Sequence, residues 1–440
     1  MIALTQAALI ILISFIRMRL AYLGFVFLLP FMPRYLGIAI GNGSFTARRL
    51  IIIFFILLFA TWLARRHKFN EMIKLVHRNL GLISAVVFLF IVKIISTCLN
   101  AGVANLLYVA DDFLASMPII LMTMMFIRSD AARQSLLVAI VAGLFGSELL
   151  SIVEFFKQTP LLVGSVDFNV EGAEEIEAGK FRDDMLRAAA LFDNPLLLSE
   201  FVCISWPLSL YLYQYANSRV LRTLAFFALI LAPVTLFFVN SRSGWLIFFF
   251  TVIYMWLSFL WVRMDKTLRL VTGGILVVLS LIAVVGIIDV FQSPEKYFSR
   301  RESEGISALE RINQYSVVST AFSEHPLLGY GTQQNVAEDL DFLNHMDNYW
   351  LKLIIESGLL GIVTFAIMLF ILIKQTSRLK RLVTSVYDKK LLLALMSSLM
   401  AFSVNLLFLS MPSNNIYFFI IAGLVAGWTA DRKQLTPIQQ

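Results

Sequence analysis

Charged residues are scarce in this chain, and cysteine is nearly absent. Charged side chains make up 15% of its 440 residues, hydrophobic side chains make up 59%, and the mean hydropathy is +0.80. A soluble domain does not need so much apolar surface, so the repeated apolar runs indicate a polytopic α-helical membrane protein. The two cysteines, Cys98 and Cys203, both lie in apolar segments and provide neither a disulfide framework nor a CxxC metal site.

The signatures of several enzyme classes are also missing. The sequence contains no HExxH, no paired His/Cys ligand set, no P-loop and no GxSxG, so metal, nucleotide and acyl-serine chemistry have no support. We therefore expect no metal and no cofactor. The net charge of +7 does not indicate a nucleic-acid partner, because the basic residues sit in short loops, where they set membrane orientation.

Apolar runs predict an all-α polytopic membrane protein with about twelve spanning helices in a single integral membrane domain, residues 1–440. Ile2–Ile16 is either a thirteenth span or a membrane-surface helix. We keep it in the mature chain because no basic residue precedes it and no small-residue cleavage site follows it. The expected spans are Leu20–Ile40, Leu50–Ala64, Gly81–Thr97, Val103–Ile127, Ser135–Phe156, Leu196–Ala216, Thr223–Val239, Trp245–Val262, Leu270–Asp289, Tyr349–Ile373, Leu391–Ser410 and Ile416–Ala430.

Basic clusters occupy alternate loops, which should therefore be cytoplasmic. Arg48 and Arg49 break this pattern, because they fall in a loop that alternation places outside. Two of the outside loops, residues 157–195 and 290–348, are too long to be simple connectors. The first carries an acidic run, and the second contains apolar residues at near-helical spacing over Ile306–Phe322, which predicts an amphipathic helix on the membrane surface. The basic clusters are Arg65, Arg66 and Lys68; Arg128 and Arg133; Arg219 and Arg222; Arg263, Lys266 and Arg269; and Lys374–Arg381.

Three arginines on the outside face could bind an anion. Arg242 lies between two apolar runs, where its side chain must reach water or meet an anion, and the neighbouring Ser241 and Ser243 add donors that suit a phosphate. A snorkelling interfacial arginine is the alternative. Arg311 and Arg187 each have a solvated side chain as the default, but together the three charges match a lipid diphosphate.

His345 is the sharpest catalytic candidate. A neutral imidazole can accept a proton from an attacking hydroxyl, and Asp347 and Asn348 could orient it, although a lone loop histidine is more often structural. His325 is weaker, because His-Pro followed by Leu-Leu-Gly is typical of a rigid turn. Acids in or near the spans leave a transporter as an alternative, although no pair of interrupted helices at matching positions supports one. These acids are Asp111, Asp112, Glu148, Glu154 and Glu200.

Four motifs resemble the O-antigen ligase and Wzy-type polysaccharide polymerase superfamily. They are RAAALFDNP at Arg187–Pro195, NSRSGWL at Asn240–Leu246, LERINQYSVVSTAFSEHPLLGYGTQQN at Leu309–Asn335 and HMDNYWLKLIIESGLLG at His345–Gly361. The resemblance implies a GT-C-like membrane glycosyltransferase at the outer face of the cytoplasmic, or inner, membrane. Such enzymes take a glycan from undecaprenyl diphosphate and join it to an acceptor sugar with inversion and without a metal.

The resemblance also implies roles for individual residues. Arg242 and Arg311 match the arginines that hold the donor diphosphate, His345 matches the base or acceptor-orienting histidine, and Arg187 matches an arginine of less certain role. Many family members have a second histidine directly before the asparagine, where this chain has Asp347. This difference puts in doubt whether His345 alone performs the histidine role.

The possible transferase functions differ in the acceptor that receives the glycan. We expect a polymerase that extends an O-antigen or exopolysaccharide, because two long outside loops could hold a donor chain and an acceptor chain. The main alternative is a ligase that moves finished glycan to a lipid A core, and a small-solute or ion transporter is the alternative from another class. The expected partners are the undecaprenyl-diphosphate-linked oligosaccharide, an acceptor glycan or lipid A core, and membrane lipid, with a chain-length regulator and a flippase as further candidates.

Overall fold

The structure is a computed structural model, and it describes residues 17–32, 37–40, 43–161, 180–182, 185–263, 267, 303–332, 348–409 and 414–435. The described chain is almost entirely helical, with two short antiparallel hairpins. The predicted span Leu270–Asp289, the run Ile2–Ile16 and about half of the two long loops lie outside these residues. The predicted site residues His345 and Asp347 lie outside them as well.

The helices follow the apolar runs of the sequence, and polar residues begin several of them. Side-chain oxygens of Ser129, Asn194, Asn348 and Ser385 accept hydrogen bonds from the first free backbone N–H groups of their helices. The helices are α2 (Met18–Leu28), α3 (Ala47–Arg65), α4 (Phe69–Arg78), α5 (Leu80–Ser96), α6 (Leu106–Leu114), α7 (Met117–Phe126), α8 (Asp130–Lys157), α10 (Pro195–Tyr215), α11 (Arg219–Val239), α12 (Arg242–Arg263), α14 (Ser303–Glu324), α15 (Tyr349–Leu382), α16 (Val386–Asn405) and α17 (Asn415–Leu435), with short η1 (Leu29–Phe31), η2 (Thr97–Ala101) and η3 (Val103–Asn105).

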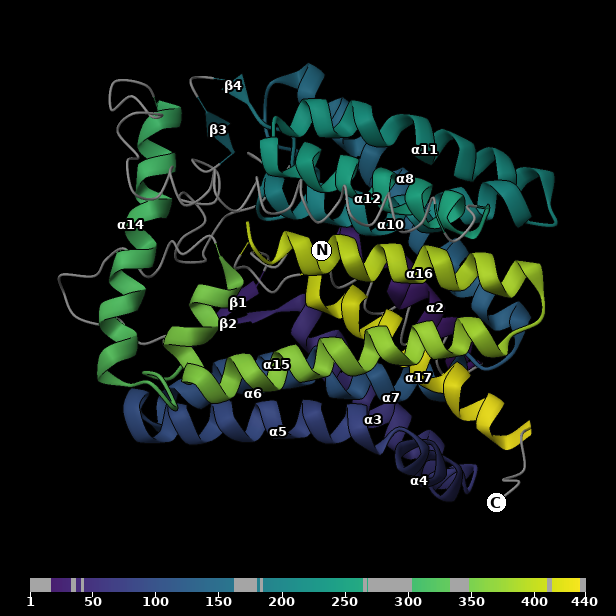
Figure 1. The fold of residues 1–440 in the computed structure, drawn as a ribbon, viewed down its shortest axis with the longest axis horizontal. Helices are drawn as coiled ribbons and strands as arrows, with labels where there is room; N and C mark the ends of the chain where they lie inside the picture. Colours follow the sequence, from purple (N-terminus) through teal and green to yellow (C-terminus); the bar gives the residue numbers. More distant parts are fainter. Residues whose placement is uncertain are drawn as a thin grey trace.

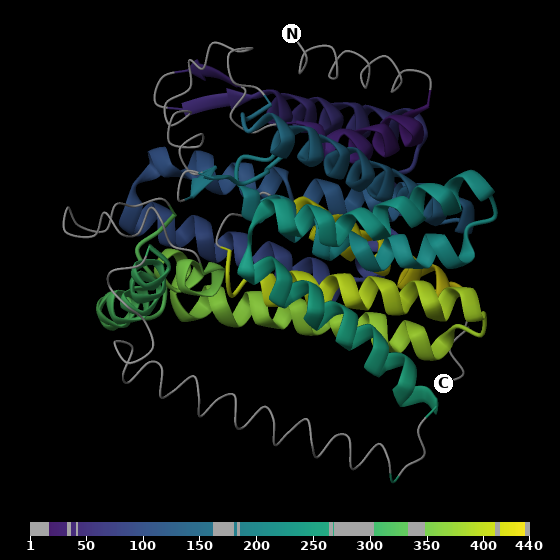
Figure 2. The same cartoon turned by 90° about the horizontal axis from the view of Figure 1, so that it is seen from above.

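The long helices run side by side along one axis, so the molecule has two distinct ends (Figures 1 and 2). The connections between α10 and α11 and between α15 and α16 lie at one end, on the right of Figure 1, together with α4 and the end of the described chain. The opposite end, which we call the outer end, carries α14 and both hairpins. The basic clusters of the described residues therefore gather at the end opposite α14, as the alternation of loops predicted.

The structure corrects parts of the predicted spans. Six described helices are long and apolar enough to cross a membrane, or seven if α3 and α4 form one bent span, with three shorter apolar helices besides, so the expected count of twelve or thirteen is not confirmed. Leu20–Ile40 is not one helix, because Gly37–Ile40 forms β1, paired antiparallel with β2 (Gly43–Thr46). The predicted span Val103–Ile127, by contrast, is confirmed as a candidate span over Val103–Phe126. Within it the chain forms η3, α6 and α7 in succession, with Pro118 at the start of α7.

A backbone clamp joins the end of α14 to a break in α15. Gly358 has non-helical dihedral angles, φ 59° and ψ −157°, and interrupts the hydrogen-bond ladder of α15. The segment Pro326–Gly331, which we call the clamp, replaces the lost partners. Its carbonyl oxygens accept from the N–H groups of Leu359 and Leu360 at 2.9 and 3.2 Å, and its N–H groups donate to the carbonyls of Ile355 and Glu356 at 2.6 and 3.1 Å.

The end of α5 and η2 also hold the clamp in place. The Ser96 hydroxyl donates to the carbonyls of Leu328 and Glu356, at 2.5 and 2.8 Å, and the Asn100 amide donates to the Gly329 carbonyl at 2.7 Å. Three parts of the chain that are distant in sequence are therefore held together at the outer end. Because α14 leads directly into the clamp, the clamp fixes where α14 ends.

Candidate active site

The turn between α11 and α12 presents Arg242 at the outer end. Asn240 ends α11 in the left-handed conformation (φ 49°), and the buried Ser241 hydroxyl accepts a hydrogen bond from the N–H of Gly244 at 3.0 Å. Ser243 shares a 3.1 Å hydrogen bond with the same hydroxyl. Arg242 is exposed in the first turn of α12, so its charge adds to the positive end of the helix dipole.

Arg187 contacts the other end of the same turn, where α11 ends. Its Nε donates to the carbonyl oxygen of Val239, the last residue of α11, at 3.1 Å. The N–H of Ala188 donates to the carbonyl of Phe238 at 3.0 Å. The structure therefore brings two of the three predicted arginines, Arg187 and Arg242, to the two sides of one helix-to-helix turn.

A buried ion pair, which the sequence analysis did not assign to the site, holds the Arg187 segment in place. The Glu154 carboxylate, at the end of α8, accepts from the N–H groups of Ala189 and Ala190 at 2.7 and 2.6 Å. The Lys180 ammonium lies 3.8 Å from the same carboxylate, and both side chains are buried. A carboxylate without these partners would be costly to bury, so Glu154 has a structural role in the RAAALFDNP motif.

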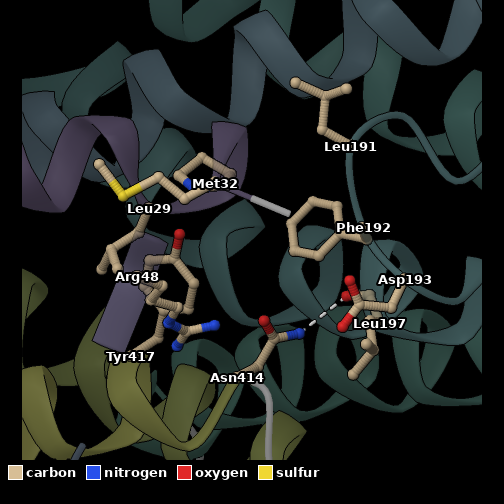
Figure 3. A pocket seen from close by; sticks show the side chains of 10 residues that line it. Leu29, Met32, Arg48, Leu191, Phe192, Asp193, Leu197, Asn414 and Tyr417 are labelled. Carbon is tan, nitrogen blue, oxygen red and sulfur yellow. Dashed lines mark hydrogen bonds between the residues drawn. The ribbon is translucent and has the colours of Figure 1, made fainter. Parts of the chain in front are cut away.

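The remainder of this motif lines a small pocket (Figure 3). Leu191, Phe192 and Asp193 face Arg48 of α3 and Asn414 across a cavity of about 10 Å³, which is close to the smallest space that holds one water. The Asn414 amide donates to the Leu197 carbonyl at 2.8 Å, the interaction drawn in Figure 3. This pocket connects the motif to η1, α3 and α17, and it is too small for a sugar.

Asn348 links the predicted histidine region to α14. Its side-chain oxygen caps α15 by accepting from Trp350 and Leu351, and its Nδ2 donates to the Tyr315 hydroxyl on α14 at 3.3 Å. Arg311 lies on α14 one helical turn before Tyr315. The described residues therefore connect the helix that carries Arg311 to the residue that lies three positions after His345.

His325 occupies a turn, as its sequence suggested. Its carbonyl accepts from the N–H of Gly329 at 3.0 Å, and its exposed ring packs edge-on against Tyr330, with ring centres 4.5 Å apart. The Tyr330 hydroxyl donates to the Glu324 carboxylate. Burial and this carboxylate raise the pKa of Tyr330 to about 12, so its hydroxyl keeps its proton at physiological pH. These contacts stabilise the end of α14 and the clamp.

Four of the five acids that suggested a transporter have partners that fix neighbouring elements. Glu154 is engaged as described above, whereas both carboxyl oxygens of the buried Glu148 lack a hydrogen-bond partner among the described residues. The pairing of Arg49 with Asp111 also accounts for one of the two arginines that broke the charge alternation. The contacts made by the other three partnered acids are Arg49–Asp111 at 2.8 Å, Lys93–Asp112 at 2.6 Å and Asn414–Glu200 at 2.9 Å.

The outer end therefore offers positive charge and hydrogen-bond donors to an anion. α10, α12 and α15 all begin there, and the positive ends of their dipoles add to the charges of Arg187 and Arg242. Among the residues that the structure describes, no group of three or more His, Cys, Asp or Glu side chains could hold a metal ion. This arrangement suits electrostatic stabilisation of a phosphate-containing group.

Comparison with known proteins agrees with three of the four motifs, those at 240–246, 309–335 and 345–361. A family model described as O-Antigen ligase matches residues 226–366, a range that contains Arg242, Arg311, His345 and the clamp but begins after Arg187. No curated protein matches the chain. Over the matched residues, from within α11 to the middle of α15, the chain is therefore similar to the O-antigen ligase family.

Proposed function

We propose that this protein is a membrane glycosyltransferase that moves a glycan from undecaprenyl diphosphate to an acceptor saccharide, acting as a polymerase outside the cytoplasmic membrane. The family match supports the class of enzyme. The observation that best supports a diphosphate donor is the exposed Arg242 at the start of α12, with Arg187 on the other side of the same turn. A guanidinium can hold two phosphate oxygens at once.

In the proposed inverting reaction, an acceptor hydroxyl oxygen attacks the anomeric carbon of the donor sugar. The bond between that carbon and the diphosphate oxygen breaks, and the diphosphate leaves with the bonding electron pair. Arg242 and Arg311 stabilise the negative charge that develops on the leaving group, without a metal. His345 accepts the hydroxyl proton, a role worth roughly a hundred- to ten-thousand-fold in rate.

The arginine proposal is tested by Arg242→Ala and Arg242→Lys. We expect the alanine variant to lose nearly all transfer and the lysine variant to recover part of it, because an ammonium presents a single point charge. Arg219→Ala is the matched control, since Arg219 is an exposed arginine in the first turn of α11 at the opposite end. Full transfer by Arg242→Ala would leave this arginine as an interfacial anchor only.

The choice of a polymerase rests on charge in the first long loop. Its acidic run, from Glu171 to Glu177, should repel the phosphates of a lipid A core and tolerate a neutral or basic saccharide chain. Purified protein given only its undecaprenyl-diphosphate-linked repeat should therefore make a ladder of longer lipid-linked chains.

The family match, described as O-Antigen ligase, is equally compatible with the alternative acceptor, a lipid A core. A ligase given the single donor substrate should make nothing until lipid A core is added. Glycan that forms only on the added core would replace the polymerase proposal with the ligase one. The roles proposed for Arg242 and His345 would be unchanged by that result.

A further inference from the structure

The short helix α4 lies against the basic end of the bundle, opposite the candidate active site (Figure 1). It is bent by 110° from α3, so it does not continue the direction of that helix. Leu75 is buried against the bundle, whereas Phe69 and Ile73, one turn apart, are 43% and 58% exposed. An apolar pair that faces away from the protein, on a helix that turns across the bundle, is typical of a helix in the membrane interface.

Basic side chains surround this exposed apolar pair. Arg65 ends α3, Arg66 lies in the turn before α4, and Lys74 lies directly after Ile73; all three are exposed. No ion pair joins any of them to an acid among the described residues. Three cations that need a counter-ion therefore sit beside two apolar side chains that need a non-aqueous environment.

The acids near α4 are already engaged. Glu71 contacts both Lys68, at 2.5 Å, and Arg128, and Asp431 lies 2.7 Å from Arg128. These contacts join α4 to the start of α8 and to α17. They leave Arg65, Arg66 and Lys74 without a carboxylate partner in the described part of this end, so all three are available to an external anion.

We propose that α4 is an in-plane interfacial helix that binds anionic phospholipid at the basic end of the protein. Phe69 and Ile73 enter the upper acyl region, while Arg65, Arg66 and Lys74 contact the lipid phosphates. The chemistry fits a lipid better than a soluble acidic protein, because a lipid offers both acyl chains for the exposed apolar pair of α4 and phosphates for the exposed cations next to it. The role is independent of the reaction at the outer end.

The test is native mass spectrometry of the full-length protein, released from detergent after titration with phosphatidylglycerol or with phosphatidylcholine. The wild-type protein should retain phosphatidylglycerol preferentially. Each basic residue near an anionic surface strengthens binding by roughly fivefold, so Arg65→Gln/Arg66→Gln/Lys74→Gln should weaken phosphatidylglycerol retention by at least about tenfold. Ile73→Gln should weaken retention of both lipids, because it removes the apolar contact.

A matched triple variant separates specific binding from loss of net charge. Arg219→Gln/Arg381→Gln/Lys389→Gln removes three exposed cations from the same end of the protein, and it should retain phosphatidylglycerol as the wild type does. Equal losses in the two triple variants would overturn the proposal. So would equal retention of the two lipids by the wild type, which would leave α4 as a surface for a different partner. Thermal melting of each variant confirms that it is folded.

Discussion

Replacing Gly329 by alanine tests whether the clamp stabilises the protein. Gly329 has φ +67°, and a Cβ added to it would stand 2.2 Å from the Ile355 carbonyl oxygen and 2.8 Å from the N–H nitrogens of Ser357 and Gly358. These neighbours are backbone atoms, which cannot move aside as the end of a flexible side chain can. The alanine therefore has to push Pro326–Gly331 away from the break in α15.

The expected loss of stability has two parts. A left-handed alanine costs about 1–2 kcal/mol relative to glycine. Displacing the clamp breaks its hydrogen bonds to Ile355 and Glu356, each worth about 0.5–1.5 kcal/mol. Together these terms predict a loss of roughly 2–5 kcal/mol in the free energy of unfolding.

The assay is thermal denaturation of the purified protein in detergent, compared with Gly24→Ala as the control. Gly24 lies in α2, and a Cβ there would have no heavy atom within 4 Å. Alanine favours a helix by roughly 1 kcal/mol over glycine, so this control should melt at or above the wild-type temperature. If both variants melt at the same temperature, the clamp does not contribute to stability as argued.

Three other substitutions test contacts at the outer end. Glu154→Ala should destabilise the protein by about 3–5 kcal/mol, because it leaves Lys180 buried without a counter-ion; thermal melting measures this, and Glu154→Gln should lose less because one acceptor oxygen remains. Asn348→Ala should cost about 0.5–2 kcal/mol through the lost helix cap, whereas Asn348→Asp should restore the melting temperature but not the contact with Tyr315. Asp111→Asn should lower the melting temperature, since it removes the charge opposite Arg49, and an unchanged temperature would make that pair a solvated surface contact.

The sequence predicted the helices more successfully than the breaks within them. Apolar runs of bilayer length are local signals, so α5, α8, α10, α11 and the helix of the second long loop, α14, could be placed from composition and spacing alone. The break in α15 could not, because Gly358 is one of many glycines in an apolar run. Its partners are in Pro326–Gly331, and only the folded chain shows that these segments meet.

The candidate site, like the fold, could be predicted from the sequence only in part. Arg187 and Arg242 were identified because an arginine next to an apolar run needs an explanation, but nothing in the sequence places them on one turn. Glu154 was noted only as an acid near a span end. The available signal was an acid in the last turn of an apolar helix, Glu154, followed later in the chain by Lys180 and the run Ala188–Ala190. That signal is weak, since the two parts lie 35 residues apart.

Many of the motif residues that carry the family resemblance hold neighbouring parts of the chain together. Asn194, Ser241 and Asn348 cap helices, and Gly329 and Gly358 allow the clamp to meet α15. Another membrane enzyme could keep all of these contacts while its loops bound a different acceptor. Shared motifs are therefore stronger evidence for the arrangement of helices and arginines than for the acceptor, and the choice between polymerase and ligase depends on loop residues outside the motifs.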